Sequence, residues 1–196
     1  MNPPDAARRR RGRRTLVLLA LVCIAPVAAS YAAYYWHWLR PAAQVNYGEL
    51  LGAPGAPEIV GSAADGAPMR LSALRGHWVL LMADAAACDA PCAEALYATR
   101  QARTMQGAER ERVVRVLLQA ADAPGPSAEL LAQHPELIVI RGDPRQWDAL
   151  PGPGGATSAI YVVDPLGNLV LRYPSDPDIK RLAKDLERLL RASRIG

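Results

Sequence analysis

The sequence predicts an α/β domain, a mixed β-sheet with flanking helices, preceded by one N-terminal transmembrane helix. Near the N-terminus, residues 15–35 contain no charged side chain. From residue 77 onward, short apolar runs alternate with segments of helical periodicity, and the chain closes with a strand–turn–strand pair and an amphipathic segment. Such alternation is typical of a sheet covered by helices. The 196 residues are enough for one such domain and an anchor.

The N-terminal region has the charge pattern of a membrane anchor. Residues 1–14 contain six arginines and one acidic residue, and the 21 residues that follow are uncharged. About 20 apolar residues span a bilayer as a helix, and basic residues mark its cytoplasmic end. Aromatic residues gather at the other end, as is typical of a membrane–water interface. We therefore predict a cytoplasmic tail at 1–14, an inner-membrane anchor at 15–38 and a periplasmic C-terminal domain.

The N-terminal charge and hydropathy could also indicate a cleaved signal peptide or a nucleic-acid-binding segment, and the sequence favours neither. A cleaved signal peptide would use the small residues Val27–Ser30, but a signal peptide's apolar region is typically only about 7–15 residues long. Binding to nucleic acid would need a basic face on the folded domain. Beyond residue 14 the chain has 17 basic and 18 acidic residues, so no nucleic-acid partner is expected.

The remaining chain divides into a linker at 39–56 and a domain at 57–196. Strands are expected at 58–60, 69–71, 77–83, 112–120, 137–140, 159–163 and 169–172. Helices are expected at 93–106, 127–133 and 176–193, with one helical turn at 144–150. The last helix has an apolar stripe from Ile179 to Leu190, and its charged residues are expected to face solvent.

A pair of cysteines, Cys88 and Cys92, follows the strand expected at 77–83 and lies at the start of a helix. A helix N-terminus favours thiolate, although Asp89 opposes that effect. Two thiolates suit a soft ion such as Cu(I), and they also lie within disulfide reach of each other. A purely structural disulfide is the third possibility. Cys23 lies inside the apolar span and is interpreted as a small hydrophobic residue there.

The residues around this pair resemble a known family. The run from His77 to Cys92 and the later segment from Ser158 to Asn168, SAIYVVDPLGN, are similar to the Sco/SenC proteins. The resemblance implies a thioredoxin-like fold and a copper chaperone that helps to assemble the binuclear copper centre of cytochrome c oxidase. It implies copper as cofactor, Cys88 and Cys92 as its ligands or as a redox dithiol, and an oxidase subunit or assembly factor as partner.

The chain departs from the Sco/SenC pattern at the third copper ligand. The position of the family's distal histidine falls on Ala156 or Thr157, and neither binds copper well. The three histidines present, His37, His77 and His134, are expected to be surface or interface residues. Met82, a further soft donor, is expected in the core.

Two other functions remain open within the same fold. One is general thiol–disulfide exchange, although thioredoxin-like oxidoreductases usually carry C-x-x-C and a cis-proline, and Ala156–Ser158 here contains no proline. The other is a non-catalytic scaffold for respiratory complex assembly. The leading prediction is a Sco-like accessory protein that handles copper, or the redox state of copper-site cysteines, through Cys88 and Cys92.

Overall fold

The computed structural model describes residues 3–35, 46–84, 86–152, 159–193 and 195. The chain forms two compact units, Met1–Gln44 and Val45–Gly196. The second unit therefore begins before the boundary expected at residue 57, because a short strand at 49–50 already belongs to its sheet.

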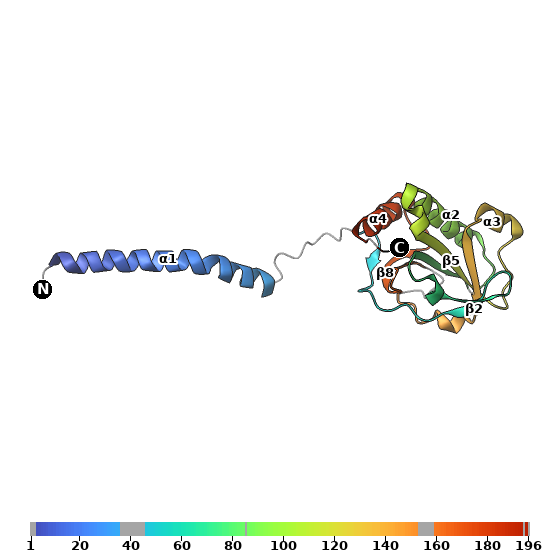
Figure 1. Cartoon of the computed structure of the whole chain (residues 1–196), viewed down its shortest axis with the longest axis horizontal. Helices are drawn as coiled ribbons and strands as arrows, with labels where there is room; N and C mark the ends of the chain where they lie inside the picture. Colours follow the sequence, from blue (N-terminus) through green and yellow to red (C-terminus); the bar gives the residue numbers. More distant parts are fainter. Residues whose placement is uncertain (1–2, 36–45, 85, 153–158, 194, 196) are drawn as a thin grey trace. The chain divides into compact units, whose positions relative to one another are not determined.

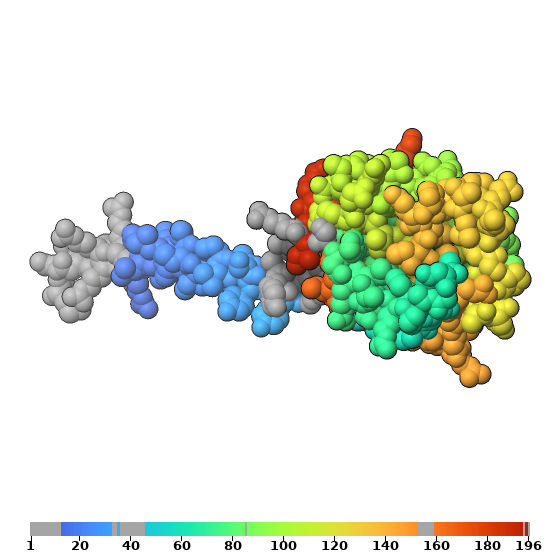
Figure 2. All heavy atoms as spheres, turned by 45° about the vertical axis from the view of Figure 1, so that its right-hand side comes forward, coloured from blue at the N-terminus to red at the C-terminus, as the bar shows by residue number. Residues whose placement is uncertain are grey.

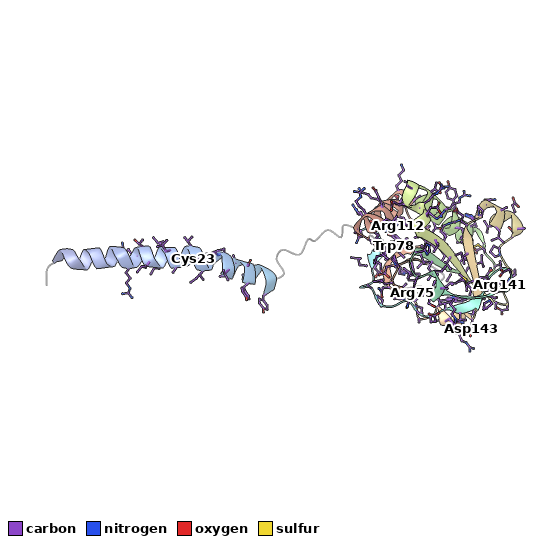
Figure 3. All side chains as sticks on the ribbon, in the orientation of Figure 1. Cys23, Arg75, Trp78, Arg112, Arg141 and Asp143 are labelled. Carbon is purple, nitrogen blue, oxygen red and sulfur yellow. A yellow bond between two sulfur atoms is a disulfide. The ribbon has the colours of Figure 1, made fainter. Side chains whose placement is uncertain are left out.

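The first unit is one long helix, α1, Pro3–Tyr35. Its segment Arg13–Ala32 is apolar and long enough to cross a membrane, and none of that segment is buried. Residues 36–38 of the predicted anchor lie outside the described residues. Cys23 projects from the middle of this helix as an exposed, free thiol (Figure 3). Exposed apolar side chains on an isolated helix are what a lipid environment requires.

The second unit is built on an eight-stranded sheet in the order β1-β8-β7-β4-β5-β6-β2-β3 (Figure 1). Neighbours β4, β5 and β6 are parallel, and the other pairs are antiparallel. The strands are β1 Glu49–Leu50, β2 Val60–Ser62, β3 Pro68–Arg70, β4 Trp78–Asp84, β5 Val113–Ala120, β6 Leu137–Gly142, β7 Ala159–Val163 and β8 Leu169–Pro174. The predicted mixed sheet is confirmed, and β4 lies inside it with a partner on each side.

Three helices lie on one face of the sheet: α2, Ala90–Thr104; α3, Ala128–Gln133; and α4, Ile179–Ala192. They close one core cluster, in which Leu80 and Leu117 from the sheet are buried with Leu186 of α4. The side chain of Ser127 caps α3 by accepting a hydrogen bond from the Leu130 N–H, as predicted. Arg103 of α2 pairs with Glu136, so the surfaces of α2 and the α3–β6 region adjoin (Figure 2).

The opposite face of the sheet is covered by short 3-10 segments and loops. These segments are η1, Leu71–Leu74, and η3, Pro144–Gln146. The core cluster on this face includes Ile59, Leu81 and Trp147, each almost fully buried. The helical turn expected at 144–150 is therefore the shorter η3. A further 3-10 segment, η2, Gly107–Arg112, joins α2 to β5 on the helical side, where Arg112 donates a hydrogen bond to the Leu190 carbonyl of α4.

The prediction that all charged residues of the last helix face solvent is wrong at Asp185, which is 2% exposed. Its Oδ2 accepts hydrogen bonds from the backbone N–H groups of Tyr47 (2.7 Å) and Gly48 (3.0 Å) and from the hydroxyl of Tyr173 (3.2 Å). Arg188 pairs with the other oxygen at 3.2 Å. The carboxylate is buried because it supplies the acceptor that the backbone at 47–48 needs.

The hydrogen bonds to Asp185 clamp residues 47–48, at the start of the domain, to α4, and Tyr47 adds further contacts to this clamp. Its ring lies 5.7 Å from that of Tyr173, and the guanidinium of Arg181 lies over it at 4.3 Å. Its hydroxyl oxygen accepts a hydrogen bond from the backbone N–H of Asp178 at 3.1 Å. The residues at which the N-terminal tether joins the domain are thus fixed to the C-terminal helix.

Candidate functional site

The cysteine pair lies where β4 passes into α2. Helix α2 begins at Ala90, not at the predicted residue 93, and Asp89 is its N-cap. Cys88 therefore precedes the helix, and Cys92 is its third residue. Pro91 in the first turn suits a helix start because the missing N–H would have no helical partner there.

The side chain of Asp89 stabilises this helix start. Its Oδ1 accepts a hydrogen bond from the Cys92 N–H at 3.4 Å, a long contact. The sequence suggested only that Asp89 would oppose thiolate formation; the structure adds that it caps the helix.

Cys88 and Cys92 are joined by a disulfide, with their Cα atoms 5.1 Å apart. Both are half-buried and pack against the core cluster beneath α2. The pair is thus reachable from solvent on one side and held by packing on the other. A cysteine pair placed in this way can take part in thiol–disulfide exchange with another protein while its own position stays fixed.

A cleft of about 220 Å³ lies beside Cys92. Its lining includes Met82, which is 4% exposed. The hydroxyl of Thr99 donates a hydrogen bond to the Met82 sulfur at 3.5 Å. Met82 is therefore a core residue, as predicted, and its sulfur already has a partner. The lining residues are Met82, Ala83, Asp84, Asp89, Pro91, Cys92, Ala95, Leu117, Ala159 and Ser175.

Asp84, the last residue of β4, is a site residue that sequence reasoning missed. One of its carboxylate oxygens and the two cysteine sulfurs all lie within 4.8 Å of one another. Its Oδ1 accepts a hydrogen bond from the Ala86 N–H at 2.9 Å. Partial burial raises the pKa of Asp84, the Ala86 N–H opposes this, and the charge of Asp89 adds to it. An acid four residues before Cys88 was the available signal.

Gln119 fixes the loop between Asp84 and the cysteines. It is fully buried on β5, directly opposite Asp84 in the parallel register. Its side-chain amide donates to the carbonyl of Pro124 at 2.8 Å and, less closely, to that of Ala86 at 3.4 Å. The loops after β4 and β5 are therefore tied together behind the site.

Of the two histidines in the described part of the chain, neither joins the group formed by Asp84 and the two cysteines. His77 is exposed just before β4, at the strand end opposite the dithiol, as expected. His134 was expected to be a surface or interface residue, but it is buried inside the domain: it is 3% exposed, and its Nδ1 lies 3.2 Å from Nη1 of Arg115. Predicted positions His37, Ala156 and Thr157 lie outside the described residues.

Burial and neighbouring positive charge lower the pKa of His134. Burial is the larger cause, and with the charges of Arg115 and Arg100 it lowers the pKa of His134 to about 4. Burial also lowers the pKa of Arg115, to about 10, with Arg103 adding to the effect. A neutral imidazole that receives a hydrogen bond from an arginine is a structural partner rather than a metal ligand.

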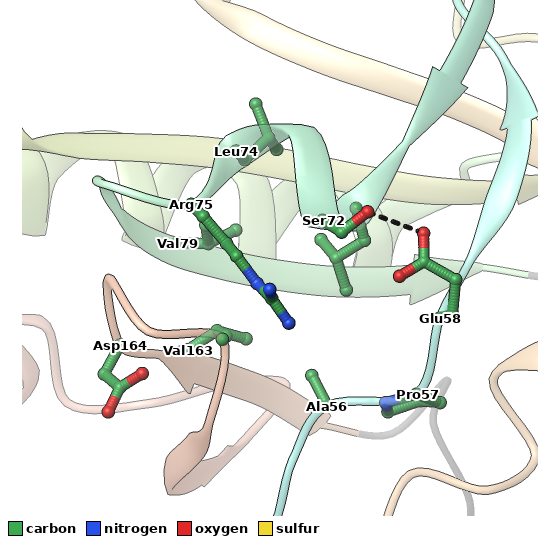
Figure 4. A pocket seen from close by; sticks show the side chains of 11 residues that line it. Ala56, Pro57, Glu58, Ser72, Leu74, Arg75, Val79, Val163 and Asp164 are labelled. Carbon is green, nitrogen blue, oxygen red and sulfur yellow. Dashed lines mark hydrogen bonds between the residues drawn. The ribbon is translucent and has the colours of Figure 1, made fainter.

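A second pocket lies at the other end of β4, between η1 and the turn that follows β7 (Figure 4). There the hydroxyl of Ser72 donates to a Glu58 carboxylate oxygen at 2.7 Å, and Arg75 extends into the space. Its volume of about 30 Å³ has room for little more than water. The cleft beside Cys92 adjoins the disulfide, and for this reason it is the candidate functional site.

Comparison with protein families places the chain in a known family. A family model described as "Transmembrane-like, thioredoxin-like, C-terminal domain" matches residues 78–193, well over half of the chain. The chain belongs to this transmembrane-like, thioredoxin-like family. The model of the corresponding N-terminal domain matches residues 6–37, in agreement with an apolar anchor helix. Among curated proteins, none matches the sequence.

Solved structures of Sco proteins resemble the C-terminal domain of this family member. Apo Sco1 from Thermus thermophilus is 25% identical, with a TM-score of 0.59 over 76% of this chain and 99% of that one. Copper-bound ScoI from Bradyrhizobium japonicum is 20% identical, with a TM-score of 0.52 over 68% and 98% of the two chains. Copper-bound yeast Sco1 is 15% identical, with a TM-score of 0.59 over 71% and 95%. The predicted thioredoxin-like fold and the resemblance to Sco proteins are confirmed.

Proposed function

We propose that this protein is a membrane-anchored, Sco-like accessory protein of cytochrome c oxidase biogenesis. Its Cys88–Cys92 pair would act as a dithiol that keeps the copper-site cysteines of a partner reduced. The observation that carries the proposal is the pair itself, which forms a disulfide at a half-buried position beside a cleft. Similarity to Sco1 at the level of fold supports the pathway.

The reaction would transfer two electrons. In the reduced protein, one thiolate attacks a disulfide of the partner and forms a mixed disulfide, and one partner thiolate leaves. The second cysteine then attacks the mixed disulfide, so that the Cys88–Cys92 bond forms and the second partner thiol is released. A membrane-associated thiol reductant would return the pair to its reduced form. The anchor would keep this chemistry at the inner membrane, with the domain on the periplasmic side.

A second candidate function is copper transfer by the same pair, favoured by the copper-bound Sco structures that share the fold. The donor set fits in part only. Two cysteine sulfurs are adjacent, but among the described residues no histidine approaches them, and the family's ligand position carries alanine or threonine in the sequence. If copper is held, Cys88 and Cys92 would bind it as Cu(I), because thiolate is its preferred ligand.

The reduction potential of the pair tests the first function. The full chain in detergent is equilibrated with thiol–disulfide buffers, and the free thiols are counted by alkylation. A value between roughly −270 and −120 mV is expected for a dithiol that exchanges with other proteins, whereas a value below about −300 mV indicates an inert structural bridge and refutes the proposal. Cys88→Ser, which leaves one thiol of the pair, is the control for the alkylation count.

Copper transfer is tested by competition. Reduced wild type, Cys88→Ser and Thr157→His are titrated with Cu(I) against a chelator of known affinity. Retention by the wild type that is lost in Cys88→Ser supports copper binding. Retention only after Thr157→His would show that the chain lost the ligand that copper handling needs.

A further inference from the structure

In the described lining of the cleft, no positive charge balances the carboxylates beside the cysteine pair. Asp84 and Asp89 both line the cleft, and among its described lining residues there is no lysine, arginine or histidine. No ion pair of either acid occurs in the described part of the domain. Reduction of the disulfide would add up to two further negative charges. A partly buried group of anions without a cation is unfavourable unless it coordinates a metal or stays protonated.

From this arrangement we propose that Asp84, with reduced Cys88 and Cys92, forms a three-donor site for a divalent ion of borderline softness, of which Zn²⁺ is the type. One carboxylate oxygen and the two sulfurs already lie within 4.8 Å of one another. Zinc–sulfur and zinc–oxygen bonds are about 2.3 and 2.0–2.2 Å, so ligand atoms around one ion lie about 3.5 Å apart. On reduction, the two sulfurs would move apart from their bonded distance and the carboxylate oxygen would approach them to reach that spacing.

The chemistry of the donors selects a divalent ion. Zinc accepts thiolate and carboxylate together in a tetrahedral site, and a site with three protein ligands leaves the fourth position for water or a substrate. The cleft of about 220 Å³ provides room on that side. Cu(I) is selected by soft sulfur donors, so Asp84 adds little to its binding. The proposed site therefore differs from a copper site in its third ligand, which is the carboxylate of Asp84 and not a histidine.

Metal binding would be coupled to the redox state of the pair. Only the reduced form offers two thiolates, so a bound ion stabilises that form and raises the apparent reduction potential. For a two-electron couple, each tenfold excess of free ion over its Kd corresponds to about 30 mV. This inference rests on the dithiol of the proposed function, but chemical reduction in the test makes the two separable.

The test uses the full chain in detergent, reduced with a non-coordinating phosphine under anaerobic conditions. Zn²⁺ affinity is measured by competition with a chromophoric chelator, and Co²⁺ serves as a spectroscopic probe of thiolate coordination. The variants are Asp84→Asn, which retains an acceptor for the Ala86 N–H, and Asp89→Asn, a matched removal of one negative charge from the same cleft. Cu(I) affinity is measured in parallel.

We expect the wild type to bind Zn²⁺, Asp84→Asn to weaken binding at least tenfold, and Asp89→Asn to weaken it less than threefold. Cu(I) affinity should change less than threefold in Asp84→Asn. Absence of Zn²⁺ binding by the reduced wild type overturns the inference, as does equal weakening by both variants, which would indicate a general charge effect. A reduction potential below about −300 mV would refute the proposed exchange function while the zinc titration still decides the metal site.

Discussion

Acid should destabilise the domain through His134, a residue remote in sequence from the cysteines. In the folded protein, Nη1 of Arg115 lies 3.2 Å from Nδ1 of His134, and arginine has only donors, so this nitrogen must be the acceptor of a neutral ring. Protonation would remove the acceptor and place two buried cations together. Burial, then Arg115 and Arg100, accordingly lower the pKa of His134 from 6.5 to about 4.

The direction and size of the pH effect on the free energy of unfolding follow from the two pKa values of His134, folded and unfolded. Because the folded-state pKa lies below the unfolded value, the unfolded chain binds more protons between pH 6.5 and 4, and stability falls as the pH falls through that window. Two such pKa values give a loss of about 2 kcal/mol between pH 7 and pH 5, and at most about 3 kcal/mol at lower pH. This is a large part of the stability of an ordinary domain.

Urea unfolding followed by tryptophan fluorescence measures this effect, since Trp147 is 1% exposed and changes environment on unfolding. Other groups also titrate in this range, so wild type is compared with His134→Gln, which keeps an acceptor for Arg115 but cannot be protonated. The variant should be less stable than wild type at pH 7 and should close most of that difference at pH 5. If the difference between the two proteins is the same at both pH values, the account of His134 is wrong.

Three further outcomes are expected in the same unfolding assay. Asp185→Ala should cost about 3–5 kcal/mol, because two backbone N–H groups and a tyrosine hydroxyl lose their buried acceptor, whereas the exposed Glu187→Ala should cost less than about 0.5 kcal/mol. Gly61→Ala should destabilise by about 1–3 kcal/mol, because its Cβ would collide with the backbone carbonyl of Arg141 on β6; unchanged stability would mean that β2 shifts without cost. Burial, followed by the charge of Asp185, raises the pKa of Tyr173, so stability should fall as the pH rises above about 10, and Tyr173→Phe should reduce that loss.

The parts of the fold that repeat a pattern could be predicted from the sequence. The runs that became β4, β5 and β7 are apolar at nearly every position because they are buried on both faces, and helix α4 carries its apolar stripe because it is covered on one side only. Elements whose existence depends on a distant partner could not be found in this way. Strand β1 has two residues and exists through its pairing with β8.

The two cysteines of the candidate site could be identified from the sequence, but its carboxylate could not. Cys88 and Cys92 are recognisable by their spacing and by the apolar strand that precedes them. Asp84 looks in the sequence like the polar end of that strand, and its relation to the sulfurs depends on how the loop at 86–89 turns back. His134 was misjudged for the same reason, because its partner Arg115 lies 19 residues earlier, in a run that otherwise appears entirely apolar.

The clamp around Asp185 joins the start of the folded domain to its last helix. The Asp185 carboxylate accepts hydrogen bonds from the backbone N–H groups of Tyr47 and Gly48, which lie 138 and 137 residues earlier in the chain. Segments at the ends of a domain open more easily than its core strands unless contacts of this kind hold them. Loss of the Asp185 carboxylate would therefore let the first residues of the domain and helix α4 open together, before the central strands unfold.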